Sequence, residues 1–551
     1  MKSCNISIKK INRNVLIYTF LFVIVSPSLI WIFLDQSVFP WDQSWYGQLS
    51  VELFHSLIHS PLQWVKELIS AFGSKAPGIA WLGEFFVPIG QLIGSIDIGL
   101  LLSIISTQFC TLLLIYRIVF KLTNNFISII CCLFAAASPL SVGLTHQYFV
   151  EPLQTLSITW IVLIMVFAPQ WESKRILLHL ISAVSLAMIV KITSPLYFFG
   201  AILFSLYYCW NNRSINEKRL QSSSINLFSK INFLYLTAFL LTSGFLFWYG
   251  KNLQTILSFT VQASSGDASI LYGEKADFIH KIQYWLSAFQ KSFFIPNCLV
   301  FIIAILPYIS VKKILGTRKK LTLHRLSYFD IYAIISLVEI ISVLTVFSMN
   351  VNQENMYLLP ILPYLTIVIS WILAKANQKI IVIFIGLIFA FQLFWVHSQA
   401  LGLTSIDPNI SYWLYPIDQN DAKKKLLTNI VNATCNESEK ERYNIIGQEL
   451  PWFNANSASY YSVKQLLTQG FHCYYTSLGY AEKDVDKAWQ RLLDLNVNHI
   501  AMLRPDEQSQ TPDPLNQVSL PILKRIQNSS KFKLLLPIDD KSILLYKQVS
   551  H

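Results

Sequence analysis

The stretch VLIYTFLFVIVSPSLIWIFL, from Val15 to Leu34, carries no charge and is mostly apolar. An α-helix rises 1.5 Å per residue, so about 20 such residues cross the roughly 30 Å hydrocarbon core of a bilayer. The stretch is too long for the apolar part of a signal peptide, and no small-residue cleavage pattern follows it. We therefore interpret it as a membrane span that the protein retains.

The composition extends this interpretation to most of the chain. Of 551 residues, 53% are hydrophobic and 13% are charged, about half the charged share of soluble domains. Mean hydropathy is +0.46. The fold class expected is a polytopic α-helical membrane protein with about 11 transmembrane helices in residues 1–397. The candidate spans begin near Val15, Ile98, Phe126, Pro152, Ile176, Leu196, Ile231, Phe293, Ile331, Met356 and Ile380.

The distribution of charge predicts the orientation of these spans. Residues 398–551 hold equal numbers of acidic and basic residues, so the whole net charge of +12 lies in the membrane part. Basic residues concentrate in alternate connecting segments, above all in 211–224 and 311–325. Cytoplasmic loops carry such an excess, which places the N-terminus in the cytoplasm and makes nucleic-acid binding a poor explanation of the charge.

The first extracytoplasmic loop is expected at residues 35–97. Its segment 60–73 has Pro61 in the first turn, a stripe of apolar residues on one side and Gly73 at the end, which predicts an amphipathic helix lying in the interface. Segment 78–94 is apolar enough to span. A span there would move sixteen basic loop residues to the outer side, so we expect 78–94 to lie flat or re-entrant on the outer face.

The C-terminal region, residues 398–551, is called the tail below. Strand-like runs at 443–447, 499–504, 532–538 and 542–547 alternate with helix-like runs at 457–470 and 484–495, which predicts a small extracytoplasmic α/β domain. Cys435 and Cys473 are the only cysteines of the tail; an oxidising compartment would permit a disulfide, but the sequence leaves their pairing open. The pattern contains no metal-binding cysteine or histidine cluster.

Three carboxylates are expected where the chain enters or leaves the outer face: Asp42, Glu151 and Glu354. Acidic residues close to a membrane are costly without a role, which makes them functional candidates. Each also has a plain structural explanation. Asp42 could cap a helix beginning at Gln43, Glu151 could favour the first turn of its helix, and Glu354 could be a solvated loop residue.

Four motifs in this order resemble the GT-C superfamily of integral-membrane glycosyltransferases. They are DQSWY after the first span, KAPGIAWL in the first loop, EPLQTL opening the fourth span and NMYLLPILPYL opening a late span. Within that superfamily the sequence resembles glycosyltransferase family 39, which includes protein O-mannosyltransferases and the lipid A aminoarabinose transferase. The resemblance covers residues 15 to about 397, and the tail is similar to that of bacterial members.

The resemblance implies roles for individual residues. Asp42 matches the family's first-loop acid, with Asp35 the weaker claimant. Lys75 matches the lysine of the Lys-Pro-Pro motif, although Ala76 stands in place of the first proline. Glu151 matches the acid that opens the fourth span. Tyr357 matches the tyrosine of Arg-Tyr-Leu-Leu-Pro, where Met356 replaces the arginine and leaves the donor phosphate short of one cation.

The implied reaction moves a sugar from a polyprenyl phosphate to an acceptor hydroxyl with inversion, and Asp42 acts as general base. A lipid phosphate is a good leaving group, so activating the hydroxyl is the difficult step. A cation stabilises the charge that develops on the phosphate, and Lys75 is the first candidate. Lys191 and His146 are further candidates for this cation. Each also has a structural explanation: Lys191 could be a lysine at a helix end whose ammonium reaches the membrane surface, and His146 could be a loop histidine with its hydrogen bonds satisfied. No cofactor is expected, although a divalent metal stays open.

Two other functions compete with this one. Intramembrane Glu339 and His179 could mark the polar pathway of a transporter or lipid flippase, but the chain shows no repeated halves. A non-catalytic membrane assembly protein with an inherited fold is the third reading, because a fold does not fix a function. For the enzyme we expect the cell membrane as location, a polyprenyl-linked donor, a lipid, glycan or protein acceptor, and a tail that assists acceptor recognition without a catalytic group.

Overall fold

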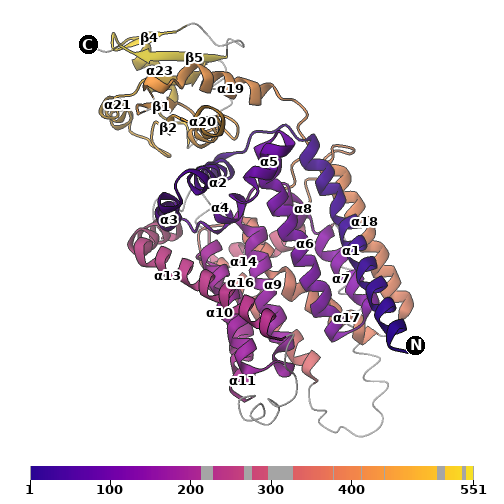
Figure 1. Cartoon of the computed structure of the whole chain (residues 1–551). Coiled ribbons are helices and arrows are strands. Elements are labelled where there is room, and N and C mark those ends of the chain that lie inside the picture. Colours follow the sequence, from indigo (N-terminus) through magenta and orange to yellow (C-terminus); the bar gives the residue numbers. More distant parts are fainter. Residues whose placement is uncertain are drawn as a thin grey trace.

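The structure is a computed structural model that describes residues 2–211, 227–265, 273, 276–295, 327–376, 378–410, 413–439, 441–505, 515–535 and 542–549. A long bundle of helices carries a smaller α/β unit at one end (Figure 1). The N-terminus lies at the far end of the bundle from the tail, as Figure 1 shows. The two parts meet at a layer of short helices that follows the first span.

The elements of the helical part are, in order, α1 Lys2–Leu34, α2 Trp41–His59, α3 Pro61–Ser70, α4 Gly78–Gly83, α5 Val87–Ile93, α6 Ile96–Leu122, α7 Asn125–Ala137, α8 Pro139–Thr145, α9 Val150–Phe167, η1 Ala168–Gln170, α10 Ser173–Val190, η2 Ser194–Tyr197, α11 Phe199–Asn211, α13 Leu227–Ser265, α14 Phe278–Phe293, α16 Tyr328–Met349, η4 Asn355–Ile361, α17 Leu362–Ala376 and α18 Lys379–Ala400. Those of the tail are α19 Ala422–Thr434, η5 Glu437–Glu439, β1 Tyr443–Ile446, α20 Ala455–Gln469, β2 Tyr474–Ser477, α21 Val485–Asp494, β3 His499–Leu503, α23 Ser519–Gln527, β4 Phe532–Leu534 and β5 Ile543–Gln548.

Membrane-spanning helices are fewer in the described residues than the sequence predicts. Eight helices are long and apolar enough to cross a bilayer, and α7 with α8, bent by 63°, would make nine. All nine coincide with predicted spans. The span predicted from Leu196 is represented by α11, which has 13 described residues, and the one predicted from Phe293 lies almost wholly outside the described residues. The prediction of a polytopic helical protein is confirmed.

Short helices α2 to α5 form the layer between bundle and tail (Figure 1). Segment 78–94 folds as α4 and α5, two helices of six and seven residues, and neither is long enough to span. Helix α3 begins at Pro61 as expected and exposes Leu62 and Val65. Such an exposed apolar stripe suits a helix lying in the headgroup region.

The tail folds around a five-stranded mixed sheet of order β2-β1-β3-β5-β4. Strands β2, β1 and β3 are parallel, whereas β5 runs antiparallel to both β3 and β4. The four predicted strands and two predicted helices are present within a few residues. Strand β2 was missed because its sequence, YYTS, has only four residues and no apolar alternation.

Helix α20 of the tail packs along α2 of the membrane part. Gly47 of α2 permits this close approach, since an added Cβ would lie 2.8 Å from the ring of Tyr460. That ring is stacked on Phe39, with centroids 5.5 Å apart. The Oγ of Ser457 donates to the carbonyl of Phe39 at 2.9 Å. The tail is therefore fastened to the segment that carries Asp42.

A buried charge network adds to this interface. Asp97, in the first turn of α6, accepts a hydrogen bond from the Tyr460 hydroxyl at 2.7 Å. The same carboxylate pairs with Lys464 at 2.6 Å and with Lys424 at 3.1 Å. Two cations and a phenol around one carboxylate satisfy it, as a buried charge requires. The network joins α6 to α19 and α20.

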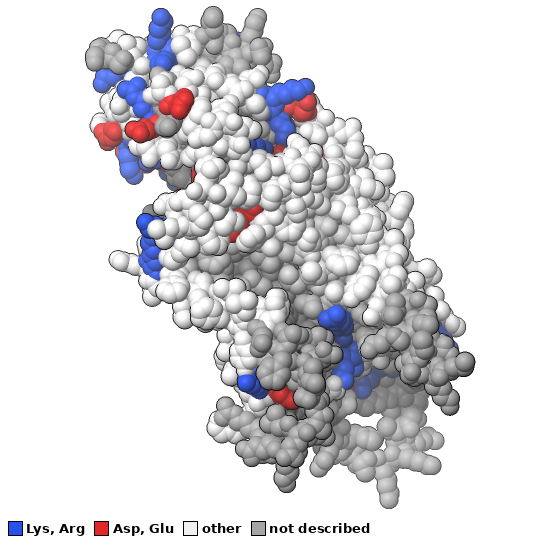
Figure 2. Space-filling view, viewed as in Figure 1, with Lys and Arg blue, Asp and Glu red and all other residues white. Residues whose placement is uncertain are grey.

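Charged side chains gather at the two ends of the molecule in the face shown in Figure 2. They occur on the tail and at the opposite end of the bundle, while the middle is almost free of blue or red. A belt without charge is the surface expected to face hydrocarbon. The basic segments on which the predicted orientation depends, 211–224 and 311–325, lie almost wholly outside the described residues.

Candidate active site

Asp42 lies in the first turn of α2, one position after Trp41. The helix begins at Trp41 and its N-cap is Pro40, which makes no side-chain cap hydrogen bond. A helix starting at Gln43 with Asp42 as its cap was therefore the wrong expectation. The carboxylate is free of a capping role and instead makes a contact across the loop.

Lys75 supplies that contact. Its Nζ is 2.6 Å from Oδ2 of Asp42, and the two side chains are 21% and 34% exposed. The same ammonium lies 5.2 Å from the ring centroid of Trp45. Lys75 stands on the irregular segment between α3 and α4, two residues after Gly73, whose φ of +67° favours glycine. Ala76 stands where the resemblance leads us to expect a proline, and Lys75 nevertheless lies beside Asp42.

Glu151 and Lys191 form a second ion pair, between the start of α9 and the residue that follows α10. Glu151 is fully buried, and Lys191 is 14% exposed. One oxygen, Oε1, accepts from Lys191, while the buried Oε2 has no hydrogen-bond partner among the described residues. A carboxylate oxygen held without a partner is a position at which a ligand hydroxyl would bind.

Tyr46 is close enough to the carboxylates of both ion pairs to interact with them electrostatically. It is 4% exposed and its ring contacts Phe149, immediately before α9, at a centroid distance of 6.3 Å. Burial raises the pKa of the Tyr46 hydroxyl well above its usual value, and the carboxylates of Asp42 and Glu151 raise it further. The two acids are thus near enough to one phenol to act on it electrostatically. Four segments of the membrane part meet at this place.

Tyr357 completes the group. The Nζ of Lys191 lies 4.1 Å from its ring centroid, within the range of a cation–π contact. The hydroxyl of Tyr357 accepts a hydrogen bond from Nδ2 of Asn352 at 3.2 Å, and its backbone carbonyl accepts one from the hydroxyl of Tyr197 at 2.7 Å. The ammonium of Lys191 therefore lies next to Tyr357, the residue that follows Met356, where the resemblance leads us to expect an arginine.

His146 is placed differently from the other candidates. Its ring is stacked on Trp31, 4.3 Å between centroids, and its Nε2 is 3.1 Å from Oγ of Ser28. The ring of His397 is 6.2 Å away. These partners belong to α1 and α18, so the contacts of His146 are with core helices.

Asp35 is hydrogen-bonded to the first part of the tail, ahead of α19. Its Oδ1 accepts from the backbone of Asp418 at 2.9 Å, and Oδ2 accepts from that of Ser37 at 3.2 Å. Burial raises the pKa of Asp35, and the hydrogen bonds from Ser37 and Asp418 oppose that rise. Asp35 is thus engaged in joining the end of α1 to the start of the tail.

Sequence reasoning missed Tyr46 and Tyr197. Tyr46 follows Asp42 by four residues, a spacing that puts both on one side of a helix, so the signal was present once α2 was assigned. Tyr197 has no such signal, because its position depends on the turn after α10. Among the described residues, no three His, Cys, Asp or Glu side chains are placed to hold a metal ion.

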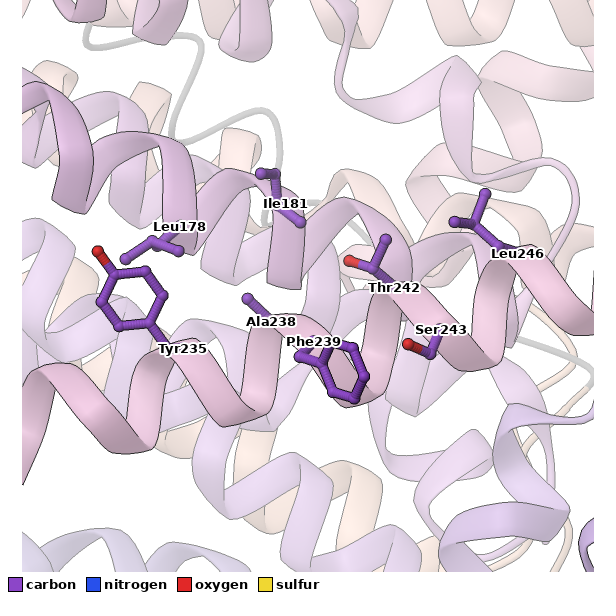
Figure 3. A pocket seen from close by; sticks show the side chains of 8 residues that line it. All are labelled: Leu178, Ile181, Tyr235, Ala238, Phe239, Thr242, Ser243 and Leu246. Carbon is purple, nitrogen blue, oxygen red and sulfur yellow. The ribbon is translucent and has the colours of Figure 1, made fainter.

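Helices α10 and α13 border an apolar groove of about 400 Å³ (Figure 3). Leu178 and Ile181 come from α10, and Tyr235, Phe239 and Leu246 from α13. The α10 residues stand ten or more positions before Lys191, so the groove is separate from the ion pairs. Its lining suits a hydrocarbon chain better than a polar ligand.

The intramembrane polar residues that could mark a transport pathway have structural partners. Glu339 Oε1 accepts a hydrogen bond from the backbone of Gly200, in the first turn of α11. His179 Nδ1 is 3.2 Å from Nε1 of Trp160, and its ring lies on Trp171. These contacts account for both residues without a pathway.

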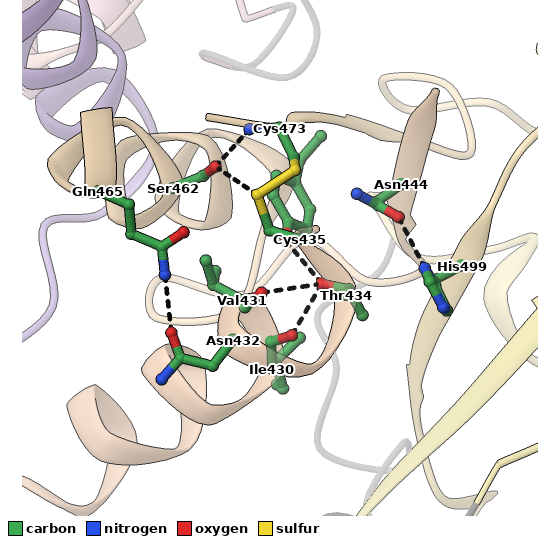
Figure 4. The surroundings of a disulfide bond; sticks show 11 residues. Ile430, Val431, Asn432, Thr434, Cys435, Asn444, Ser462, Gln465, Cys473 and His499 are labelled. Atoms are coloured by element: carbon green, nitrogen blue, oxygen red, sulfur yellow. Dashed lines mark hydrogen bonds between the residues drawn. A yellow bond between two sulfur atoms is a disulfide. The ribbon is translucent and has the colours of Figure 1, made fainter. Parts of the chain in front are cut away.

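Cys435 and Cys473 form a disulfide between the end of α19 and the residue before β2 (Figure 4). The Ser462 hydroxyl of α20 contacts both cysteines: it donates to Sγ of Cys435, which carries no proton in the disulfide, and accepts from the backbone N–H of Cys473 at 2.8 Å. The pairing that the sequence left open is thus present. It ties α19 and β2 around the helix that packs on α2.

The arrangement as a whole is that of a membrane glycosyltransferase. Residues 74–248 match the family model described as dolichyl-phosphate-mannose-protein mannosyltransferase, and this segment includes Lys75, Glu151 and Lys191. A search of curated protein sequences finds no match. The predicted enzyme class, a glycosyltransferase of the GT-C kind, is confirmed.

Among solved structures the chain is similar to ArnT from Cupriavidus metallidurans. The apo structure has a TM-score of 0.58 and 11% identity, covering 98% of each chain. The structure bound to undecaprenyl phosphate has a TM-score of 0.56 and 11% identity, covering 97% of this chain and 98% of that one. The ArnT-like fold therefore extends over nearly the whole chain, the tail included.

Proposed function

We propose that this protein transfers a sugar from a polyprenyl-phosphate donor to an acceptor hydroxyl on the extracytoplasmic face of the cell membrane. The observation that carries the proposal is the meeting of two lysine–carboxylate pairs around Tyr46. The family matched by 74–248 is described by a dolichyl-phosphate sugar, and one similar structure holds undecaprenyl phosphate, which supports a lipid-phosphate donor.

Asp42 acts as general base in this proposal. It is one-third exposed, so an acceptor hydroxyl has access to it, and the ammonium of Lys75 holds its Oδ2 in place. An ionised carboxylate within hydrogen-bond reach of the hydroxyl takes its proton as the new bond forms. The opposite bond, from the anomeric carbon to the phosphate, breaks in the same step, so configuration inverts.

An inverting reaction requires different roles for the two lysine–carboxylate pairs. In an in-line displacement the base and the leaving phosphate stand on opposite sides of the anomeric carbon. Lys75, which forms an ion pair with the base, then serves chiefly to orient Asp42, and Lys191 beside Tyr357 is the cation for the phosphate. In the sequence analysis Lys75 is the first candidate for the phosphate-binding cation and Lys191 is a further one. Here the phosphate-binding role passes to Lys191.

Glu151 keeps Lys191 in place and presents its second oxygen to a sugar hydroxyl. Extracytoplasmic placement is supported by the disulfide of the tail, since such bonds persist in oxidising compartments. The apolar groove between α10 and α13 offers a place for part of a lipid chain.

The decisive experiment is an Asp42→Asn substitution. The donor would be the lipid-linked sugar that accumulates in cells lacking the protein. Asparagine retains size and hydrogen bonding but cannot accept the proton, so sugar transfer should fall by roughly 10²- to 10⁴-fold. Asp35→Asn, measured in parallel, should have the smaller effect. Undecaprenyl-phosphate binding should be unchanged by Asp42→Asn. Full transfer by a folded Asp42→Asn protein would refute the general-base role.

A further inference from the structure

Glu449 of the tail contacts the residue that precedes Asp42. Its Oε2 accepts a hydrogen bond from the indole Nε1 of Trp41 at 3.2 Å, across 408 positions of sequence. Glu449 is 8% exposed. Burial raises the pKa of Glu449 to about 7, while hydrogen bonds from Trp41 and Ser477 favour the charged form. The tail therefore reaches the active-site helix with a buried carboxylate.

The backbone of Trp41 shows why that contact matters. Its φ is +24°, outside the regions that non-glycine residues ordinarily adopt. Such a conformation persists only when the surroundings hold it, and it occurs most often at functional sites. Trp41 is the first residue of α2 and Asp42 is the second, so the direction of the Asp42 side chain depends on this turn.

Glu449 is itself fixed by the tail sheet. Strands β1, β2 and β3 are parallel, so their carboxyl ends share one edge. Glu449 follows β1 by three residues, Ser477 ends β2, and Oδ1 of Asn516 accepts from the Glu449 backbone at 2.7 Å. Open α/β sheets commonly bind their ligands at this edge. Here the residue bound at this edge, through Glu449, is the indole of Trp41.

We propose that Glu449 is a positioning residue, which holds the strained Trp41 turn and so directs Asp42 towards the acceptor. The inference rests on the proposed base role of Asp42. It gives the tail a part in the reaction itself: transfer needs the hydrogen bond between Glu449 and Trp41, although neither residue touches the substrate. The tail was expected to assist the acceptor only, and this role goes beyond that.

The test is a double-mutant cycle of Glu449→Ala and Trp41→Phe in the full chain. Each substitution removes the same hydrogen bond, so each should lower kcat for sugar transfer by roughly 10-fold or more, since small misplacements of a reacting group are costly. The double variant should be no slower than the slower single variant. Undecaprenyl-phosphate affinity should stay within about 2-fold of the unmodified protein, because Lys191 and Tyr357 are untouched.

Glu449→Gln is the rescue variant. Its amide oxygen still accepts the indole N–H, so kcat should stay within about 3-fold of the unmodified protein. Glu482→Ala, which breaks the ion pair between the half-buried Glu482 and the exposed Lys487, is the matched control and should leave kcat unchanged. If Glu449→Ala does not fold, the Gln and Trp41→Phe variants still decide the question.

Three results would overturn the inference. They are full kcat in Glu449→Ala, losses that multiply in the double variant, and a Gln variant as slow as the Ala variant. A failure here differs from a failure of the proposed function. If Asp42→Asn is inactive while Glu449→Ala is fully active, only the positioning role falls. If Asp42→Asn is active, the base role of Asp42 is refuted, and with it the positioning role of Glu449 that rests on it.

Discussion

Glu151 combines full burial, one bond to Lys191 and one oxygen without a partner among the described residues. A buried carboxylate of this kind needs a paired cation. Removing one partner of a buried pair leaves the other charge uncompensated and costs about 3–5 kcal/mol. The pair therefore contributes to the stability of the fold as well as to the proposed ligand binding. These two roles can be tested separately.

Lys191→Met should lower the free energy of unfolding by about 3–5 kcal/mol and weaken undecaprenyl-phosphate binding. Adding Glu151→Gln removes the stranded charge, so the double variant should recover most of the stability but none of the affinity. Thermal unfolding and a binding titration would measure the two effects. Recovery of affinity in the double variant would show that Lys191 does not contact the phosphate.

Glu84 provides a pH-dependent prediction. It is 1% exposed, accepts from Nε1 of Trp64 at 3.0 Å, and burial raises its pKa to about 7. Because the folded pKa lies above the unfolded value of about 4.5, the protonated residue is favourable at low pH and this contribution is lost as pH rises through 7. Glu84→Gln should thus stabilise the protein by about 1–3 kcal/mol at pH 8 and change little at pH 4.5. Equal effects at both pH values would contradict the raised pKa.

At the scale of elements, α2 is packed on both sides. Its outer side accepts α20 at Gly47, and the ring of Tyr460 cannot retreat, because Phe39 stacks on it and Asp97 binds its hydroxyl. An overpacked contact of this kind costs about 1–3 kcal/mol. The helix that carries Asp42 is therefore sensitive to a single methyl group.

Gly47→Ala should destabilise the protein by about 1–3 kcal/mol and lower sugar transfer, although alanine favours helices by about 1 kcal/mol over glycine. Tyr460→Leu added to Gly47→Ala should relieve the clash. The control is Gly250→Ala in α13, where an added Cβ meets nothing within 4 Å, and where a small gain in stability is expected. A neutral Gly47→Ala variant would mean that α2 and α20 are less closely packed.

At the scale of the whole molecule, the tail and the loop between α9 and α10 lie at opposite ends of the bundle (Figure 1). If the tail is extracytoplasmic, a cysteine at Lys483 should react with a membrane-impermeant maleimide in intact cells. A cysteine at the exposed Glu172 should react only after the cells are opened. Labelling in the reverse order would invert the topology. The disulfide gives an independent check, since Cys435 and Cys473 should resist alkylation until they are reduced.

The sequence predicted what depends on local pattern. Nine spans, four strands and the amphipathic α3 follow from length and periodicity, and Asp42 with Lys75 followed from motifs whose residues prove to be 2.6 Å apart. It could not predict contacts between distant segments. The bond from Trp41 to Glu449 has no local signal, and β2, with the sequence YYTS, lacks the apolar residues that marked the other strands. The start of α2 was misplaced because Trp41 has an unusual φ, which no propensity describes.

The distance in sequence between Trp41 and Glu449 also has a consequence for biosynthesis. Helix α2 leaves the ribosome several hundred residues before the strand and loop that will hold its first turn. During that interval the proposed base, Asp42, has been synthesised, but Glu449 does not yet hold the turn that precedes it. A chain that stops anywhere before residue 449 would insert its first helices and still lack a directed Asp42. If Glu449 positions Asp42 as proposed, sugar transfer begins only after translation has reached the last fifth of the message, and truncated products occupy the membrane without consuming the lipid-linked sugar.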